Sequence, residues 1–200
     1  MKITDIKQQV KRQDRYSIYV DGKYVFSFSE NELLNLGLRI GQEFEAGELE
    51  ELKKTAIEDK AYMRCLDLIM RRLRSEWEIR DYLKRKDYEP DVIEKTVGRL
   101  SNAGYADDNK FAEAWVNNRR LLKATSKRKL QMELRQKRVP DSMIKEVLAE
   151  DETDEREVLK ELITKKRKQT RYQDEQKLIA YLMRQGFNYE DVKSALREED

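Results

Sequence analysis

Three segments of the sequence carry the same pattern of apolar residues, and this repetition constrains the fold more than any other feature. Ser75 is followed by Ser126 after 51 residues and by Asp174 after a further 48 residues. When these three residues are aligned, the apolar residues that follow them fall into register at helical spacing. The aligned sets are Ile79, Leu130 and Leu178; Leu83, Leu134 and Leu182; Tyr88, Val139 and Phe187; Ile93, Ile144 and Val192; and Val97, Leu148 and Leu196.

Each repeat is predicted to contain three helices. Ser75 with Glu78 has the form of a capping box, and Ser126 and Asp174 are favourable N-cap residues. The predicted helices are residues 60–73, 75–86 and 90–103; 109–122, 126–138 and 141–150; and 154–168, 174–185 and 189–198. A unit of about 50 residues buries little surface alone, so the repeats should stack into an elongated, curved array. A single irregular bundle would make the matched positions accidental.

The first 59 residues differ from the rest of the chain. Short runs rich in β-branched and aromatic residues, separated by Asp21-Gly22, predict a small sheet that contains a hairpin. Ser29 is expected to cap a short helix that Gly37 ends, and a second helix should follow over residues 47–60. The chain is thus predicted to be mainly α-helical, with an N-terminal region at 1–59 and repeats at 60–108, 109–153 and 154–200.

The composition restricts the chemistry. The chain has no histidine and one cysteine, and its seven glycines form no phosphate-binding motif, so histidine-based catalysis, the usual zinc sites and nucleotide binding are not expected. We predict a protein that is not an enzyme and needs no cofactor or metal. The absence of an apolar targeting segment and of a disulfide framework predicts a cytoplasmic location.

Two stretches resemble a known family. RRLRSEWEIRDYLKRK, at 71–86, and VIEKTVGRLSNAGYADDNKFAEAWVNNR, at 92–119, resemble the signature region of the RecX regulatory proteins, and tandem three-helix units match the architecture of that family. The resemblance covers roughly residues 60–200, whereas the N-terminal hairpin resembles an extension of some members only. The chain departs from the family pattern at Leu73, where proline is usual, at Asp87, where glycine is usual, and at Tyr105-Ala106, where two aliphatic residues are usual.

This resemblance implies a function. RecX proteins are modulators of the RecA recombinase, so the implied partner is the RecA–DNA filament. The implied mode is binding in the filament groove, where the protein bridges neighbouring protomers and mostly inhibits recombinase, ATPase and co-protease activities. A monomer with no membrane association and at most weak contact with DNA is expected.

The charge distribution points to one region of this surface. Residues 109–150 carry 11 basic and 5 acidic side chains, a net charge of +6 in a chain whose total is +2. Such a patch suits either an acidic filament groove or DNA phosphate, although charged helix faces are often only solvated. On the helix predicted at 126–138, Arg128, Gln131, Arg135 and Arg138 should form one outer stripe. The candidate binding residues are Arg71, Arg72, Arg74, Arg80, Lys84, Arg119, Arg120, Lys127, Arg128, Arg135, Lys137 and Arg138.

Several alternatives stay open at this point. The chain could instead be a nucleic-acid-binding module that acts through its basic second repeat. Asp107-Asp108 is expected to cap a helix rather than to bind a metal, Trp115 is expected in the core, and Trp77 is either core or a partner anchor. In the third repeat the stripe becomes apolar at Ile179 and Met183, which indicates packing on a neighbouring repeat or, less favoured, contact with a partner.

Overall fold

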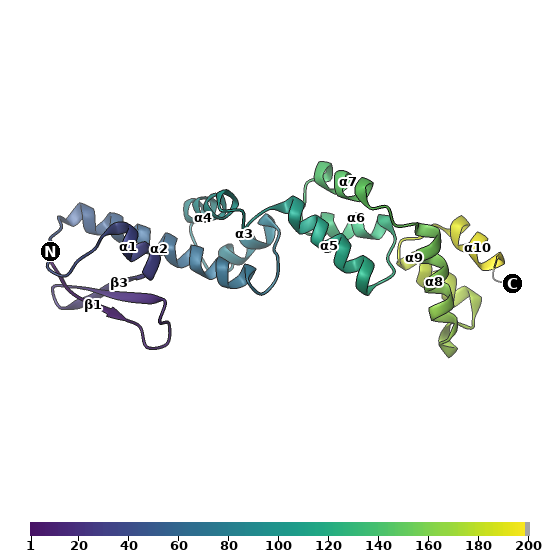
Figure 1. Ribbon diagram of the computed structural model, residues 1–200, viewed down its shortest axis with the longest axis horizontal. Coiled ribbons are helices and arrows are strands. Elements are labelled where there is room, and N and C mark those ends of the chain that lie inside the picture. Colours follow the sequence, from purple (N-terminus) through teal and green to yellow (C-terminus); the bar gives the residue numbers. More distant parts are fainter. Residues whose placement is uncertain (199–200) are drawn as a thin grey trace. The chain divides into compact units, whose positions relative to one another are not determined.

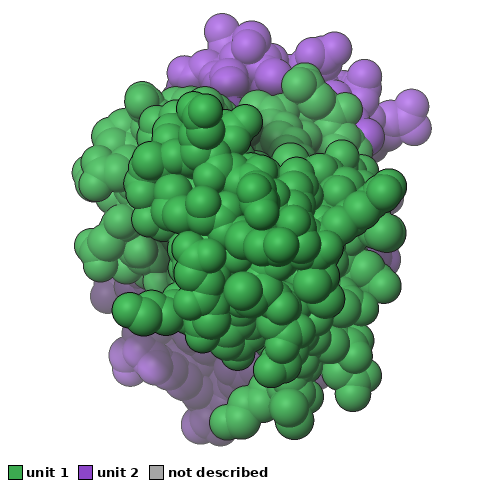
Figure 2. Space-filling view, turned by 90° about the vertical axis from the view of Figure 1, so that its left-hand side faces the viewer, with its two compact units in different colours: residues 1–74, 78–106 green, residues 75–77, 107–200 purple. Residues whose placement is uncertain are grey.

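A computed structural model describes residues 1–198 of the chain. They fall into two compact units, which are coloured separately in Figure 2: residues 1–74 with 78–106, and residues 75–77 with 107–198. No helix within residues 1–198 is both long enough and apolar enough to cross a membrane. The elements, of which Figure 1 labels all but β2 and η1, are β1 (Ile3–Gln8), β2 (Arg15–Val20), β3 (Lys23–Ser29), α1 (Glu30–Leu36), α2 (Ala46–Ile69), α3 (Glu76–Lys84), α4 (Pro90–Asn102), α5 (Asp108–Leu122), α6 (Lys127–Gln136), α7 (Asp141–Glu150), α8 (Glu155–Arg167), the 3-10 helix η1 (Thr170–Tyr172), α9 (Glu175–Arg184) and α10 (Tyr189–Arg197).

The N-terminal region is an antiparallel sheet of three strands in the order β1-β2-β3. Asp21 and Gly22 both have positive φ, at 48° and 79°, which is the geometry of a tight hairpin turn. The Ser29 hydroxyl accepts a hydrogen bond from the amide of Glu32 and caps α1, and Gly37 ends that helix in the left-handed conformation. The predicted hairpin, cap and helix end are therefore confirmed.

One prediction for this region was wrong. Residues 47–60 and 60–73 were expected to form two helices, but they belong to the single helix α2. Between Glu48 and Ile69 the sequence contains neither glycine nor proline, so nothing interrupts the helical hydrogen bonding. The division of the chain into four domains stays a prediction, and its first boundary, after residue 59, falls inside α2.

A buried polar cluster joins the sheet to α2. The Asp59 carboxylate accepts hydrogen bonds from the amide and the hydroxyl of Ser29, at 2.8 and 2.6 Å, and lies 3.1 Å from Nη1 of Arg15. The side chains of Arg15 and Asp59 are both almost fully buried. Because a buried carboxylate needs such partners, this cluster holds the sheet against the middle of α2.

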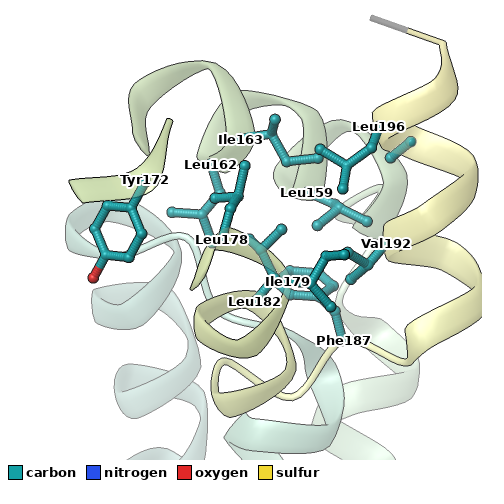
Figure 3. Close-up of a cluster of buried hydrophobic side chains, with 11 residues drawn as sticks. Leu159, Leu162, Ile163, Tyr172, Leu178, Ile179, Leu182, Phe187, Val192 and Leu196 are labelled. Carbon is teal, nitrogen blue, oxygen red and sulfur yellow. The ribbon is translucent and has the colours of Figure 1, made fainter. Parts of the chain in front are cut away.

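Each repeat contains three helices, although in the first repeat the first of them is the C-terminal part of α2, and the second helix lies at the centre of each core. Leu83, Leu134 and Leu182 are all completely buried, at 0% exposure, as their aligned positions predicted. In the third repeat, Leu182 packs with Leu178 and with Phe187 from the connection to α10, as Figure 3 shows. The amphipathic spacing of the sequence is thus sufficient to place the core of each repeat.

In each repeat, the residue at one aligned position after the second helix has the left-handed conformation. Asp87, Arg138 and Gly186, which are aligned in the three repeats, have φ of 57°, 58° and 93°. Asp87 stands where the RecX pattern usually has glycine, and the turn is retained in spite of the substitution. A left-handed conformation is strained for residues that carry a Cβ, so Asp87 and Arg138 hold their turns at an energetic cost.

In the second unit, a buried serine at the start of one helix bonds to the end of a helix in the next repeat. The Ser75 hydroxyl donates to the carbonyl oxygen of Lys137, and the Ser126 hydroxyl donates to that of Gln185, both at 2.9 Å. Ser126 also accepts a hydrogen bond from the amide of Lys129, so it caps α6 as predicted. Asp174 caps α9 with its carboxylate at the aligned position.

A carboxylate from the next repeat completes each of these junctions. The amide of Glu76, the first residue of α3, donates to Asp108, the first residue of α5, at 2.8 Å. The amide of Lys127, the first residue of α6, donates in the same way to Glu155, the first residue of α8. Amide groups that a helix leaves unpaired at its start are thus paired by the following repeat.

Truncation of the central leucine of a repeat should be strongly destabilising. We expect Leu134→Ala to lower the free energy of unfolding by about 2–5 kcal/mol, because the site is completely buried and a cavity would remain. Chemical denaturation followed by circular dichroism measures this loss. Leu121→Ala, at a side chain that is 84% exposed, is the control and should change stability little. Equal losses for the two variants would contradict the placement of the core.

Substitutions at aligned left-handed positions should act in opposite directions. A Cβ on Gly186 would lie 2.2 Å from the Ser126 hydroxyl oxygen and 3.0 Å from the Lys129 amide nitrogen, so Gly186→Ala should both strain the backbone and break the junction. Asp87→Gly instead relieves strain and should stabilise by about 0.5–1 kcal/mol. Thermal denaturation of the two variants checks the prediction, and a shift of both midpoints in the same direction would contradict it.

Candidate partner-binding surface

The twelve basic residues proposed from the sequence differ in how much of their charge is available to a partner. Four of them are exposed and form no ion pair within residues 1–198: Arg71, Lys84, Arg128 and Arg138. The others have acidic, aromatic or carbonyl neighbours in the fold. The charge count alone therefore overstates the free positive charge of this surface.

Helix α6 presents the cations of the second repeat. Ser126 caps the helix, and Leu130 and Leu134 face the core, so Arg128 and Arg135 project outward. Arg135 forms a bidentate pair with Asp141, at 2.7 and 3.1 Å, in which both side chains remain about half exposed. An exposed pair of this kind is weak, and a partner could replace Asp141 at little cost.

The predicted stripe on this helix is shorter than expected. α6 ends at Gln136 instead of residue 138, and Arg138 lies beyond it in the left-handed turn. The helical phase therefore does not set the direction of Arg138. The stripe on the helix itself consists of Arg128, Gln131 and Arg135, and Arg138 extends it from the following turn.

Arg119 and Lys137 surround the ring of Trp115. The guanidinium of Arg119 lies 4.4 Å from the ring centre, and the Lys137 amine lies 5.4 Å from it. The indole nitrogen of Trp115 and Nε of Arg119 both donate to the Glu133 carboxylate, at 2.9 and 2.7 Å. Trp115 packs against the core of the second repeat, near its expected place, but stays half-buried. Trp77, for which both interpretations were open, is 41% exposed.

Arg120 and Lys127 take part in a partly buried junction. The Arg120 guanidinium donates to Asp151, at 2.5 and 3.0 Å, and to the carbonyl oxygen of Thr125. The Arg120 and Asp151 side chains are only 12% and 6% exposed. The Lys127 amine donates to the backbone carbonyl oxygen of Asp151. These contacts hold α5 and α6 against the end of α7, which gives both cations a structural role.

Two of the five candidate cations of the first repeat form ion pairs. Arg72 forms a bidentate pair with Glu78, and Arg80 forms one with Glu94. Burial, together with the nearby charges of Arg72 and Arg71, lowers the pKa of Arg74, and Nε of Arg74 has no hydrogen-bond partner among residues 1–198. The sequence could not reveal these pairs, because each acidic partner is set by the fold.

The alternative chemical sites do not form a reactive centre. Asp107 caps α5 by accepting hydrogen bonds from the amides of Asn109 and Lys110, and Asp108 accepts from Glu76. Within residues 1–198 there is no cluster of side chains that could hold a metal ion. Burial raises the pKa of the Cys65 thiol to about 12, so this cysteine stays protonated and unreactive at neutral pH.

Four family models match successive parts of the chain. They are the RecX N-terminal domain over residues 1–45 and the first, second and third RecX three-helix domains over residues 61–100, 107–148 and 153–196. The chain belongs to the RecX family. RecX regulatory proteins are not enzymes, and they modulate the RecA recombinase. The match at residues 1–45 also extends the resemblance across the N-terminal sheet.

Individual RecX proteins are similar to this protein over nearly its whole length. The regulatory protein RecX of Listeria monocytogenes serovar 1/2a is 33% identical over 99% of this chain and 76% of its own length. That of Bacillus subtilis strain 168 is 32% identical over 97% of this chain and 75% of its own length. A crystal structure of a regulatory protein RecX, 29% identical, covers 96% of this chain and 98% of its own, with a TM-score of 0.73. RecX from Lactobacillus salivarius has the same fold over 70% of this chain and 95% of its own, with a TM-score of 0.60 and 21% identity.

The Arg120–Asp151 pair should make stability depend on acid pH. Burial opposes ionisation of Asp151, but hydrogen bonds from Arg120 and Thr153 outweigh it and lower the pKa of the carboxyl group. Stability from a lowered pKa is complete above the pKa of the unfolded chain, near 4, and is lost as the pH falls through the folded value. Asp151→Asn should therefore destabilise at pH 7 and lose less stability than the parent between about pH 5 and 2. Denaturation at a series of pH values tests this, and parallel pH profiles would contradict it.

Proposed function

We propose that this RecX protein binds the assembled RecA–DNA filament through the exposed cations around α6. In this proposal the repeats lie in the filament groove, contact neighbouring protomers and limit recombinase, ATPase and co-protease activities. The observation that carries it is the position of Arg128 and Arg138. Both are exposed in the most basic repeat, and neither forms an ion pair within residues 1–198.

The surrounding contacts support this choice of surface. The side chains of Arg120 and Lys127 are bound to Asp151, so their charges serve the fold. Arg135 is paired with the exposed Asp141 and can exchange that partner for an acidic group of the filament. Arg71 and Lys84 carry the same kind of free charge in the first repeat. Interfacial cations of this type accelerate association and select acidic partners.

Charge reversal at the two free arginines should weaken filament binding. We expect Arg128→Glu with Arg138→Glu to lower the affinity for RecA filaments on single-stranded DNA by about tenfold or more, because attraction becomes repulsion. Fluorescence anisotropy of the labelled protein measures the affinity, and inhibition of strand exchange measures the effect. The matched control is Lys54→Glu with Lys145→Glu, which gives the same change in net charge at two other exposed positions.

The outcomes separate the two possible partners. Wild-type affinity in the Arg128 and Arg138 variant would contradict the proposal. The alternative function, direct binding of nucleic acid by the basic second repeat, predicts tight binding to bare DNA that weakens steeply with salt and is lost in the same variant. Binding that requires assembled RecA and remains in the Lys54 and Lys145 control supports the filament as the partner.

A further inference from the structure

A second feature borders the same helix. Between α6 and the connection from α9 to α10, the second unit contains a groove of about 590 Å³. Met132, Met183 and Tyr189 line it and are 53%, 49% and 51% exposed. Arg128 and Arg184 also line the groove. Apolar side chains that are gathered in one concave site and left half exposed are typical of interaction surfaces.

The apolar lining is not needed by the core of the third repeat. Ile179, one turn before Met183, is 9% exposed and packs with Leu178 and Leu182 inside its own repeat, as Figure 3 shows. The apolar stripe was interpreted as packing on a neighbouring repeat or as contact with a partner. Ile179 does pack, but inside its own repeat and not on a neighbouring one. Met183 instead faces the groove together with Met132. Methionine is flexible and polarizable, so a pair of them can fit apolar groups of different shape.

The rim of the groove is positively charged. Arg128 and Arg184 are exposed, and neither has an ion pair in the described part of the chain. The acidic residue of the lining, Glu133, already accepts hydrogen bonds from Trp115 and Arg119. An occupant of this groove therefore meets an apolar floor and two free guanidinium groups, which favours an apolar group flanked by negative charge.

We infer that the groove binds an acidic segment of a protein partner, which places an apolar side chain against Met132 and Met183. Nucleic acid fits the lining less well, because Tyr189 is its one exposed aromatic ring among the described residues, and successive bases need several stacking surfaces. The inference rests on the proposed function, in which the partner is the RecA–DNA filament. It assigns the groove to a segment of RecA, the protein component of that filament.

The test removes the apolar lining without a change in charge. Met132→Ser with Met183→Ser should keep the thermal midpoint close to that of the parent, because both side chains are about half exposed. We expect the affinity for RecA filaments to fall about tenfold, because interface energy concentrates in a few apolar anchors. Leu121→Ser, at an apolar side chain that is 84% exposed and lies outside the groove, is the control and should bind like the parent. A photo-crosslinking amino acid at Met132 should attach to an acidic segment of RecA.

Each outcome decides between specific interpretations. If the double methionine variant binds filaments within twofold of the parent while the Arg128 and Arg138 variant stays impaired, the inference about the groove is overturned and the proposed function stands. Failure of the unmodified protein to bind filaments at all would overturn both the groove and the proposed function. An equal loss of affinity for bare DNA, or a crosslink to DNA, would make nucleic acid the occupant and overturn the assignment to protein.

Discussion

The second unit depends on a buried serine that forms hydrogen bonds within and between repeats. Ser126 accepts the hydrogen bond that begins α6 and donates one to the carbonyl oxygen of Gln185 in the next repeat. A hydroxyl group is suited to this position because it can accept and donate at once. Ser75 makes the same donation to Lys137. Asp174, ionised at neutral pH, keeps the cap at the aligned position but cannot donate a hydrogen bond.

These junctions determine which charges remain available to a partner. The Asp151 residue at the end of α7 binds the side chains of Arg120 and Lys127, and Glu133 in the Trp115 cluster binds Arg119. A charge that the fold buries must be paired within the protein, so these side chains stabilise the fold and are not available to a binding partner. What remains on the outside is a small number of unpaired cations, among them Arg128 and Arg138. The second repeat thus combines cations that hold the fold together with cations that stay exposed and unpaired among residues 1–198.

Helix α6 shows how a single amphipathic segment can serve several purposes. Leu130 and Leu134 form the core of the second repeat, whereas Arg128 and Met132 face outward into the groove that borders the third repeat. Any change in the register of α6 would move all of these side chains together, because they share one rigid helix. The Ser126 cap and the left-handed turn at Arg138 fix both ends of that helix, so the elements that define the fold also align the proposed binding surface.

The sequence by itself determined most of the helices and the cores of the repeats, because these follow from local periodicity and from hydrogen bonds between residues close in the chain, but it did not show that α2 is one continuous helix. The burial of Leu83, Leu134 and Leu182 is the clearest case. The tertiary structure alone decided which basic residues are free. Arg120 meets Asp151 across 31 residues of chain, and no local pattern encodes that meeting. The sequence did not predict the groove at Met132 for the same reason. The position of Met132 on α6 indicates that its side chain is exposed, but Met183 and Tyr189, which line the groove with it, come from another repeat and are brought near only by folding.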